Sequence, residues 1–224
     1  MVLDFFRSGS EGSLDKIEQS VQEMLADNNI TFGLATDAVF GRVNPTEIGK
    51  DLRKSDRQVN KGERSIRREL IIHAGVAGAV DYPIMLVYMS IIKDIERVGD
   101  YSKNIWDLTI DGFSVQDAPD EAMWADRFAR TQALINDTAV IFSERNAEQA
   151  TTRLAEMDEW TSDYDNEISI LVREGSSAGP AAPRALLNRY LKRITAHLMN
   201  VMTAVVMPLD RLDYWDEDKV DRVD

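Results

Sequence analysis

The stretch Asp94-Ile-Glu-Arg-Val-Gly-Asp-Tyr-Ser-Lys-Asn-Ile105 places Glu96, Asp100 and Asn104 at successive steps of four residues. Residues four apart lie one above the other on a helix, so these oxygen-bearing side chains form one column. Gly99 sits in the same helix, where it costs about 1 kcal/mol relative to Ala. A missing side chain there lets a partner group or an ion approach closely. Such a column is either a solvated charge stripe or half of a metal-binding surface.

The rest of the chain shows helical periodicity and no convincing strand alternation. Apolar stripes and start or stop signals predict six long helices, covering about Ser13 to Phe40, Asn44 to Ala74, Asp81 to Ile110, Glu121 to Ser143, Ala147 to Val172 and Arg184 to Val206. The third helix is apolar nearly all round from Ile84 to Ile95, which predicts that it is buried centrally. The fold class is therefore all-α.

The two halves of the chain resemble each other. A shift of 96 residues aligns Arg97 with Arg193 and Asn104 with Asn200, and a shift of 102 aligns Asp56 with Asp158. A duplicated unit explains this, and we expect six helices as two tandem three-helix bundles. The predicted division is 1–112 for the first repeat, 117–209 for the second repeat and 210–224 for an acidic C-terminal tail.

The second predicted helix carries another polar column, formed by Asp56, Asn60 and Glu63. If the second and third helices pack antiparallel, this column lies beside Glu96, Asp100 and Asn104. Carboxylates brought together repel one another, and a hard cation with oxygen ligands removes the repulsion. The alternative is an ordinary solvated face that Arg97 or Lys103 neutralises locally.

Composition excludes several classes. The chain has no cysteine, which excludes disulfides and thiolate sites and favours a reducing cytoplasm. A net charge of −13 argues against nucleic-acid binding. The basic residues of the second helix are read as interleaved with acids and spread around the helix: Arg53, Lys54, Arg57, Arg64, Arg67 and Arg68. The apolar stretch from Gly75 to Ile92 is broken by Asp81 and Pro83, so no membrane span is expected.

Catalysis has no clear candidate residues. A di-iron carboxylate enzyme would need Glu-x-x-His pairs on two helices. His73 and His197 are the only histidines, and neither has Glu three residues before it. No phosphate loop or nucleophile elbow is present either. We therefore expect a protein that is not an enzyme.

The run Asp94 to Ile105 resembles the signature of the PhoU family of phosphate-uptake regulators, in which an acidic pair four residues apart is followed by Asn. The resemblance extends to Asp56-Arg-Gln-Val-Asn60-Lys-Gly-Glu63 and to the segment Leu14 to Met24, and with the repeat it covers most of the chain. It implies a six-helix, two-repeat cytoplasmic adaptor that binds metal (Fe, Mn, Mg or Zn) on an acidic surface. The implied ligands are Glu96, Asp100, Asp56, Glu63, Asn60 and Asn104.

The resemblance also implies partners. Members of the family restrain phosphate uptake by contacting the phosphate ABC transporter and its sensor histidine kinase at the inner membrane face, or accompany sodium/phosphate cotransporters. We expect a negative regulator of phosphate transport that is peripheral to the membrane through these partners. A homodimer is compatible with the sequence.

The second repeat departs from the family pattern. Lys192 and Ala196 take the positions of Glu96 and Asp100. An ammonium group repels a cation, so the second metal site is expected to be lost. Lys192 could instead pair with a carboxylate of the fifth helix.

Three hypotheses remain from the sequence. The first is a regulatory adaptor with one metal-binding face. The second is a structural protein-interaction adaptor without metal, which predicts tolerance of Glu96→Ala. The third is a metal-dependent enzyme acting on phosphate compounds, for which the sequence offers only the same carboxylates.

Overall fold

The computed structural model describes residues 11–77, 81–212 and 215. These residues form α-helices and one 3-10 turn and contain no strand, as the sequence predicts. The elements are α2 (Glu11–Val39), α3 (Pro45–Ala77), α4 (Tyr82–Ile110), α5 (Glu121–Glu144), α6 (Ala147–Glu174), α7 (Ala181–Val206) and η2 (Leu209–Arg211). Most of the predicted acidic tail, 210–224, lies outside the described residues.

Local side-chain chemistry sets the helix ends. The Asn146 carboxamide oxygen accepts a hydrogen bond from the Gln149 amide at 3.0 Å, which caps α6. Gly175 follows α6 with a φ of 80°, a conformation that glycine adopts without strain. The helix α7 begins at Ala181, three residues earlier than the sequence predicts, because Pro183 is tolerated within a first helical turn.

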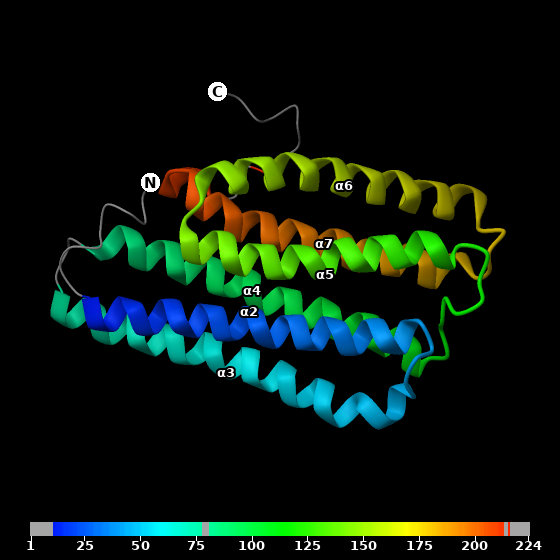
Figure 1. Ribbon diagram of the computed structural model, residues 1–224, viewed down its shortest axis with the longest axis horizontal. Coiled ribbons are helices and arrows are strands. Elements are labelled where there is room, and N and C mark those ends of the chain that lie inside the picture. Colours follow the sequence, from blue (N-terminus) through cyan, green and yellow to red (C-terminus); the bar gives the residue numbers. More distant parts are fainter. Residues whose placement is uncertain (1–10, 78–80, 213–214, 216–224) are drawn as a thin grey trace.

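The helices run back and forth along the long axis of the molecule (Figure 1). The first three, α2 to α4, pack against one another as one bundle, and α5 to α7 form the second. The bundles also pack on each other through α4 with α7 and α2 with α5. Phe32 stacks on Phe128 with ring centroids 5.4 Å apart, so the two bundles share one continuous core.

The second bundle is more open than the first. Its last two helices pack closely together, whereas α5 scarcely touches α6. The apolar side chains of α6 that are buried, such as Leu154 and Met157, join the common core. The opening leaves a groove between α5 and α6.

The helix α4 lies between α2, α3 and α7, but it is not buried all round. Tyr82, Leu86 and Met89 are 48%, 56% and 36% exposed. The predicted central burial from Ile84 to Ile95 therefore holds for most of the stretch but is wrong for the side of Leu86 and Met89, which no helix among the described residues covers.

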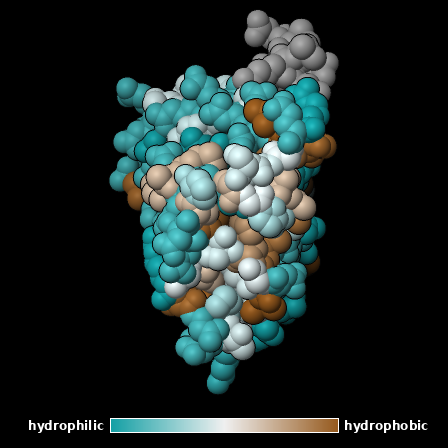
Figure 2. Space-filling model, turned by 90° about the vertical axis from the view of Figure 1, so that its right-hand side faces the viewer, coloured by the Kyte–Doolittle hydropathy of each residue, from teal (hydrophilic) through white to brown (hydrophobic). Residues whose placement is uncertain are grey.

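Figure 2 looks at the end of the molecule where the α2–α3, α4–α5 and α6–α7 connections gather. This end is mainly hydrophilic, with small apolar patches between the polar side chains. Among the described helices, none is long and apolar enough to cross a membrane.

Candidate metal-binding surface on α3 and α4

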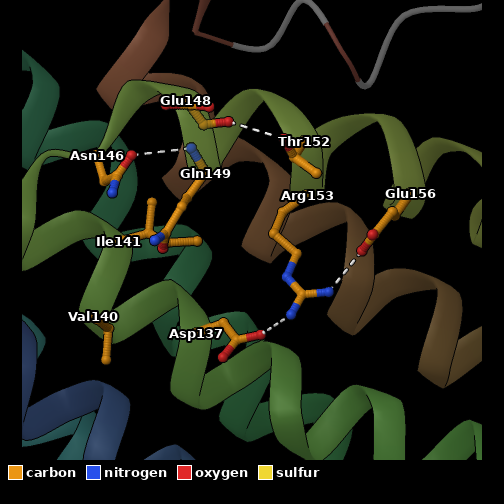
Figure 3. A pocket seen from close by; sticks show the side chains of 9 residues that line it. All are labelled: Asp137, Val140, Ile141, Asn146, Glu148, Gln149, Thr152, Arg153 and Glu156. Atoms are coloured by element: carbon orange, nitrogen blue, oxygen red, sulfur yellow. Dashed lines mark hydrogen bonds and ion pairs between the residues drawn. The ribbon is translucent and has the colours of Figure 1, made fainter.

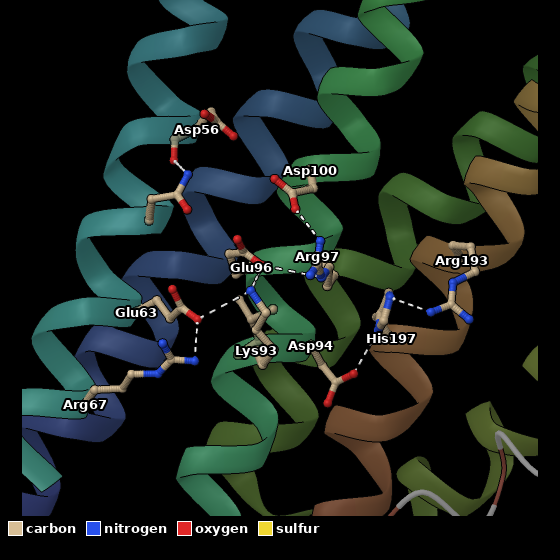
Figure 4. Close-up of polar contacts among 12 residues, drawn as sticks. Asp56, Glu63, Arg67, Lys93, Asp94, Glu96, Arg97, Asp100, Arg193 and His197 are labelled. Carbon is tan, nitrogen blue, oxygen red and sulfur yellow. Dashed lines mark hydrogen bonds and ion pairs between the residues drawn. The ribbon is translucent and has the colours of Figure 1, made fainter.

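The antiparallel pairing of α3 and α4 brings the two predicted polar columns together (Figure 4). Asp56 and Glu63 come from α3, and Glu96 and Asp100 come from α4; we call these four residues the carboxylate cluster. Glu63 and Glu96 are buried, with exposed fractions of 6% and 8%. Two carboxylates shielded from water near one another are electrostatically costly unless cations compensate them.

Basic side chains provide that compensation. Lys93 lies between the two buried carboxylates, with Nζ 2.7 Å from Glu96 Oε2 and 3.8 Å from Glu63 Oε1 (Figure 4). Arg67 Nη2 approaches Glu63 Oε1 to 2.9 Å, and Arg97 Nη1 donates to Asp100 Oδ2 at 3.0 Å. Lys93, Arg67 and Arg97 form what we call the basic clamp. In the described part of the chain, no three His, Asp or Glu side chains converge closely enough to hold a metal ion.

The basic clamp nevertheless does not fully compensate the negative charge of the carboxylate cluster. Glu63 Oε1 is buried, and its contact with Arg67 lacks the alignment of a hydrogen bond. The pKa of Asp100 is raised, first by burial and then by the negative charges of Glu96 and Asp56, and Arg97 only partly opposes this. The protein therefore holds carboxylates that favour additional positive charge.

The two predicted amide ligands lie on the same helix faces. Asn60 is half-buried, and its Nδ2 donates to the Asp56 carbonyl oxygen at 3.0 Å. Asn104 is half-buried one turn beyond Asp100. Neither amide contacts a carboxylate of the cluster directly among the described hydrogen bonds, so the structure does not join them to it.

Gly99 allows α4 to pack closely against α2. A Cβ atom at Gly99 would lie 2.7 Å from Oδ1 of Asn28 on α2. Asn28 is fully buried, and its Nδ2 donates to the Ile95 carbonyl oxygen at 2.6 Å. The close approach inferred from the sequence is made by this partner side chain.

The second repeat replaces the cluster by an ion pair. Lys192 Nζ lies 2.5 Å from Asp165 Oδ2 on α6, as the sequence suggested for this lysine. Ala196 is buried and carries no ligand. The position that corresponds to the acidic pair of the first repeat therefore has its charge balanced within the protein.

Both histidines serve structural contacts. His73 Nε2 lies 2.8 Å from Asp81 Oδ2, and both side chains are buried. His197 Nδ1 lies 2.8 Å from Asp94 Oδ1, which also accepts a hydrogen bond from Asn200 Nδ2 at 3.0 Å. The second contact joins α7 to α4 and thus one repeat to the other.

The sequence reading missed the α5–α6 groove, which has a volume of about 620 Å³ (Figure 3). Arg153 in this groove donates to Asp137 Oδ2 and Glu156 Oε2, each at 2.6 Å. Its lining contains no histidine and no nucleophile paired with a base. The sequence analysis also did not predict the role of Lys93, although Lys93 lies three residues before Glu96 and therefore on the same helix face.

The helices and their polar surface define an all-α protein of two tandem three-helix bundles, with an acidic surface where two helices of the first bundle meet. Residues 14–109 match the model of the PhoU domain. The first repeat of the chain is therefore similar to a PhoU domain.

Similarity to PhoU proteins extends over most of the chain. A phosphate-specific transport system accessory protein PhoU homolog of Synechocystis sp. is 24% identical over 207 residues, covering 89% of this chain and 90% of the relative. The crystal structure of PhoU from Pseudomonas aeruginosa matches with a TM-score of 0.74 and 17% identity, over 90% of this chain and 99% of that one. The regulatory protein PhoU from Streptococcus pneumoniae gives a TM-score of 0.64 and 17% identity, over 95% and 99%. These structures share the fold of this chain.

Proposed function

We propose that the protein is a regulator of phosphate transport, acting as a cytoplasmic adaptor rather than as an enzyme. The observation that carries this proposal is the PhoU domain match over residues 14–109, together with the similarity to a phosphate-transport accessory protein along most of the chain. The polar groups described above form ion pairs and no nucleophile–base arrangement, which fits an adaptor. Its partners would be a phosphate ABC transporter, a sodium/phosphate cotransporter, or the associated sensor histidine kinase.

This regulatory role is tested by phosphate uptake. Uptake of labelled phosphate is measured in cells with and without the gene for this chain, at high external phosphate. A negative regulator predicts faster uptake when the chain is absent and restoration when it is supplied again. Equal uptake in both strains would contradict the proposal.

We also propose that the carboxylate cluster binds a divalent or trivalent cation in exchange for the basic clamp. Two features support this: the buried Glu63 oxygen without an aligned hydrogen bond, and the raised pKa of Asp100. The clamp residues Lys93, Arg67 and Arg97 are 43–45% exposed, so their charged ends can turn outward into water. Carboxylate oxygens suit Mg, Mn, Fe or Zn, and the ion would supply the charge that the clamp supplies in this structure.

Metal content by mass spectrometry on tag-free protein tests the cation site. Glu96→Ala/Asp100→Ala should abolish bound metal, whereas Lys93→Ala should increase it, because one competing cation is removed. A matched control is Glu159→Ala/Asp163→Ala, an exposed acidic pair with the same spacing on α6.

Two results would count against the site. Metal retained in Glu96→Ala/Asp100→Ala would place the ion elsewhere. Wild type and Lys93→Ala that both remain metal-free after incubation with Mn and Fe would leave the adaptor without metal as the function.

A further inference from the structure

Between Arg53 and Arg68, the charged residues on the exposed side of α3 are all basic, although the chain as a whole has a net charge of −13. At about 100° of rotation per residue, six Lys and Arg side chains of this stretch fall within about 100° of the helix circumference. All six are exposed: Arg53, Lys54, Arg57, Lys61, Arg64 and Arg68. We call this the basic face. The interpretation that the basic residues of this helix spread around it is wrong, since all of them except Arg67, which contacts Glu63, lie within this one sector.

No acidic side chain of α3 interrupts the basic face. The acids of this stretch lie elsewhere on the helix: Glu63 is buried against α4, and Asp56 is half-buried one turn before Asn60. Within the described residues, none of the six basic side chains forms an ion pair. The basic face is about 22 Å long from Arg53 to Arg68, at about 1.5 Å per residue. It is therefore a straight row of cations without internal counterions.

The row continues into apolar side chains. Ile71 and Ile72, which are 70% and 55% exposed, follow Arg68 on the same side of α3. The exposed Tyr82 and Leu86 lie at the start of α4, at the same end of the helix pair. In Figure 1, α3 forms the lower edge of the molecule, and no other helix lies beyond it. The basic face and this apolar end are therefore both available to a partner.

We propose that the basic face of α3 docks the protein on an anionic lipid surface, with Ile71 and Ile72 entering the headgroup region. A flat row of cations beside exposed aliphatic groups provides the two kinds of contact that stable binding to a membrane surface needs. A partner that matched the charges alone would leave the aliphatic end uncovered. This inference is independent of the cation site, since none of these residues belongs to the carboxylate cluster or the basic clamp.

Vesicle co-sedimentation tests the proposal on the full-length chain. Vesicles are made of phosphatidylcholine alone, or of phosphatidylcholine and phosphatidylglycerol in equal parts. Wild type should bind the anionic vesicles at about 0.15 M salt and be released at about 1 M, where the Debye length is about 3 Å. Each basic residue near an anionic surface strengthens binding by about fivefold.

Charge-reversal variants make the test specific to the basic face. Arg57→Glu/Lys61→Glu/Arg64→Glu should weaken binding by about a hundredfold or more, from three such contributions. The control Lys16→Glu/Arg173→Glu/Arg189→Glu makes the same change in net charge at exposed sites outside the face and should weaken it far less. Circular dichroism verifies that both variants fold.

The apolar contribution is tested separately. Ile71→Ser/Ile72→Ser should weaken binding by about tenfold while leaving its salt dependence unchanged, because only apolar contact is lost.

Several outcomes would overturn the proposal. If both charge-reversal variants lost binding equally, net charge alone would explain vesicle binding and the basic face would have no specific role. Equal binding to neutral and anionic vesicles would remove the role of the cations. Absence of binding to either vesicle would exclude a lipid surface; the basic face would then belong to an acidic protein, or to nucleic acid if duplex DNA alone is bound.

Discussion

Gly99→Ala tests whether the contact between α2 and α4 positions the carboxylate-bearing helix. On an open helix surface this substitution stabilises by up to about 1 kcal/mol, because Ala is the better helix former. Here the new Cβ would lie 2.7 Å from the Asn28 oxygen, closer than carbon and oxygen atoms tolerate. Asn28 is fully buried and cannot move into solvent. Either it shifts and its 2.6 Å hydrogen bond to Ile95 is lost, or α4 moves away.

The expected change in the free energy of unfolding for Gly99→Ala combines three contributions. Overpacking of a core costs about 1–3 kcal/mol, and an unsatisfied buried polar group costs about 1–3 kcal/mol. After the gain in helix propensity, we expect a net loss of about 1–4 kcal/mol. Relative to a typical stability of about 5–15 kcal/mol, this is readily measured by urea unfolding followed by circular dichroism.

The matched control is Gly75→Ala, also in a helix, where the added Cβ meets no atom within 4 Å. It should stabilise by a few tenths to about 1 kcal/mol. In the double variant Asn28→Ala/Gly99→Ala, the destabilisation should be less than the sum of the two single effects, because the clashing group is gone. A Gly99→Ala protein as stable as Gly75→Ala would refute the reasoning.

Three further predictions concern charged groups. Because the pKa of Asp100 is raised in the folded protein, its charged form destabilises the fold, and stability falls as pH rises from the unfolded to the folded pKa. In the presence of a chelator, Asp100→Asn should therefore raise the free energy of unfolding by about 1 kcal/mol or less at pH 7 and give no gain in acid. Thermal melts across a range of pH measure this difference. Arg184 is 3% exposed and donates to Asp120 at 2.7 Å and 2.9 Å, so Arg184→Ala should cost about 3–5 kcal/mol in urea unfolding. The hydrogen bond from Arg184 lowers the pKa of Asp120 in the folded protein. The stability that this gives is present above about pH 4 and is lost as pH falls through the folded pKa. If Arg184→Ala kept the wild-type dependence of stability on acid pH, this contribution of the Arg184–Asp120 pair would be contradicted. His197→Ala should lower stability by about 1–3 kcal/mol, because Asp94 loses a buried partner that joins the repeats, and an unchanged urea midpoint would show that the contact contributes nothing.

The arrangement of six helices could be predicted from the sequence because local signals agree with one another. Asn44 before Pro45 starts α3, and the Asp111-Gly112 pair follows α4. The repeat then implied two similar bundles. The openness of the second bundle could not be predicted, because the distance between α5 and α6 depends on how both helices pack on α7 and the common core.

The column Glu96, Asp100 and Asn104 is a property of helical periodicity, and so is the column of Asp56 and Glu63. The two columns lie side by side only because α3 and α4 pack antiparallel. The sequence could not establish this packing, so the contact between the columns was predicted only on the assumption that it occurs. The basic clamp shows what periodicity alone misses. Lys93 neutralises carboxylates on two helices at once, and only the packed structure shows that it reaches both.

By itself, the sequence determined the helices, their order, their repeat and the faces on which like residues gather, because these depend on interactions between residues a few positions apart. Tertiary packing decided which faces are covered. It buried Glu63 against α4 and left the basic face of α3 and the apolar side of Leu86 open to solvent. The physical reason is that burial depends on neighbours distant in the chain, and a helix sequence does not specify which of its faces those neighbours will cover.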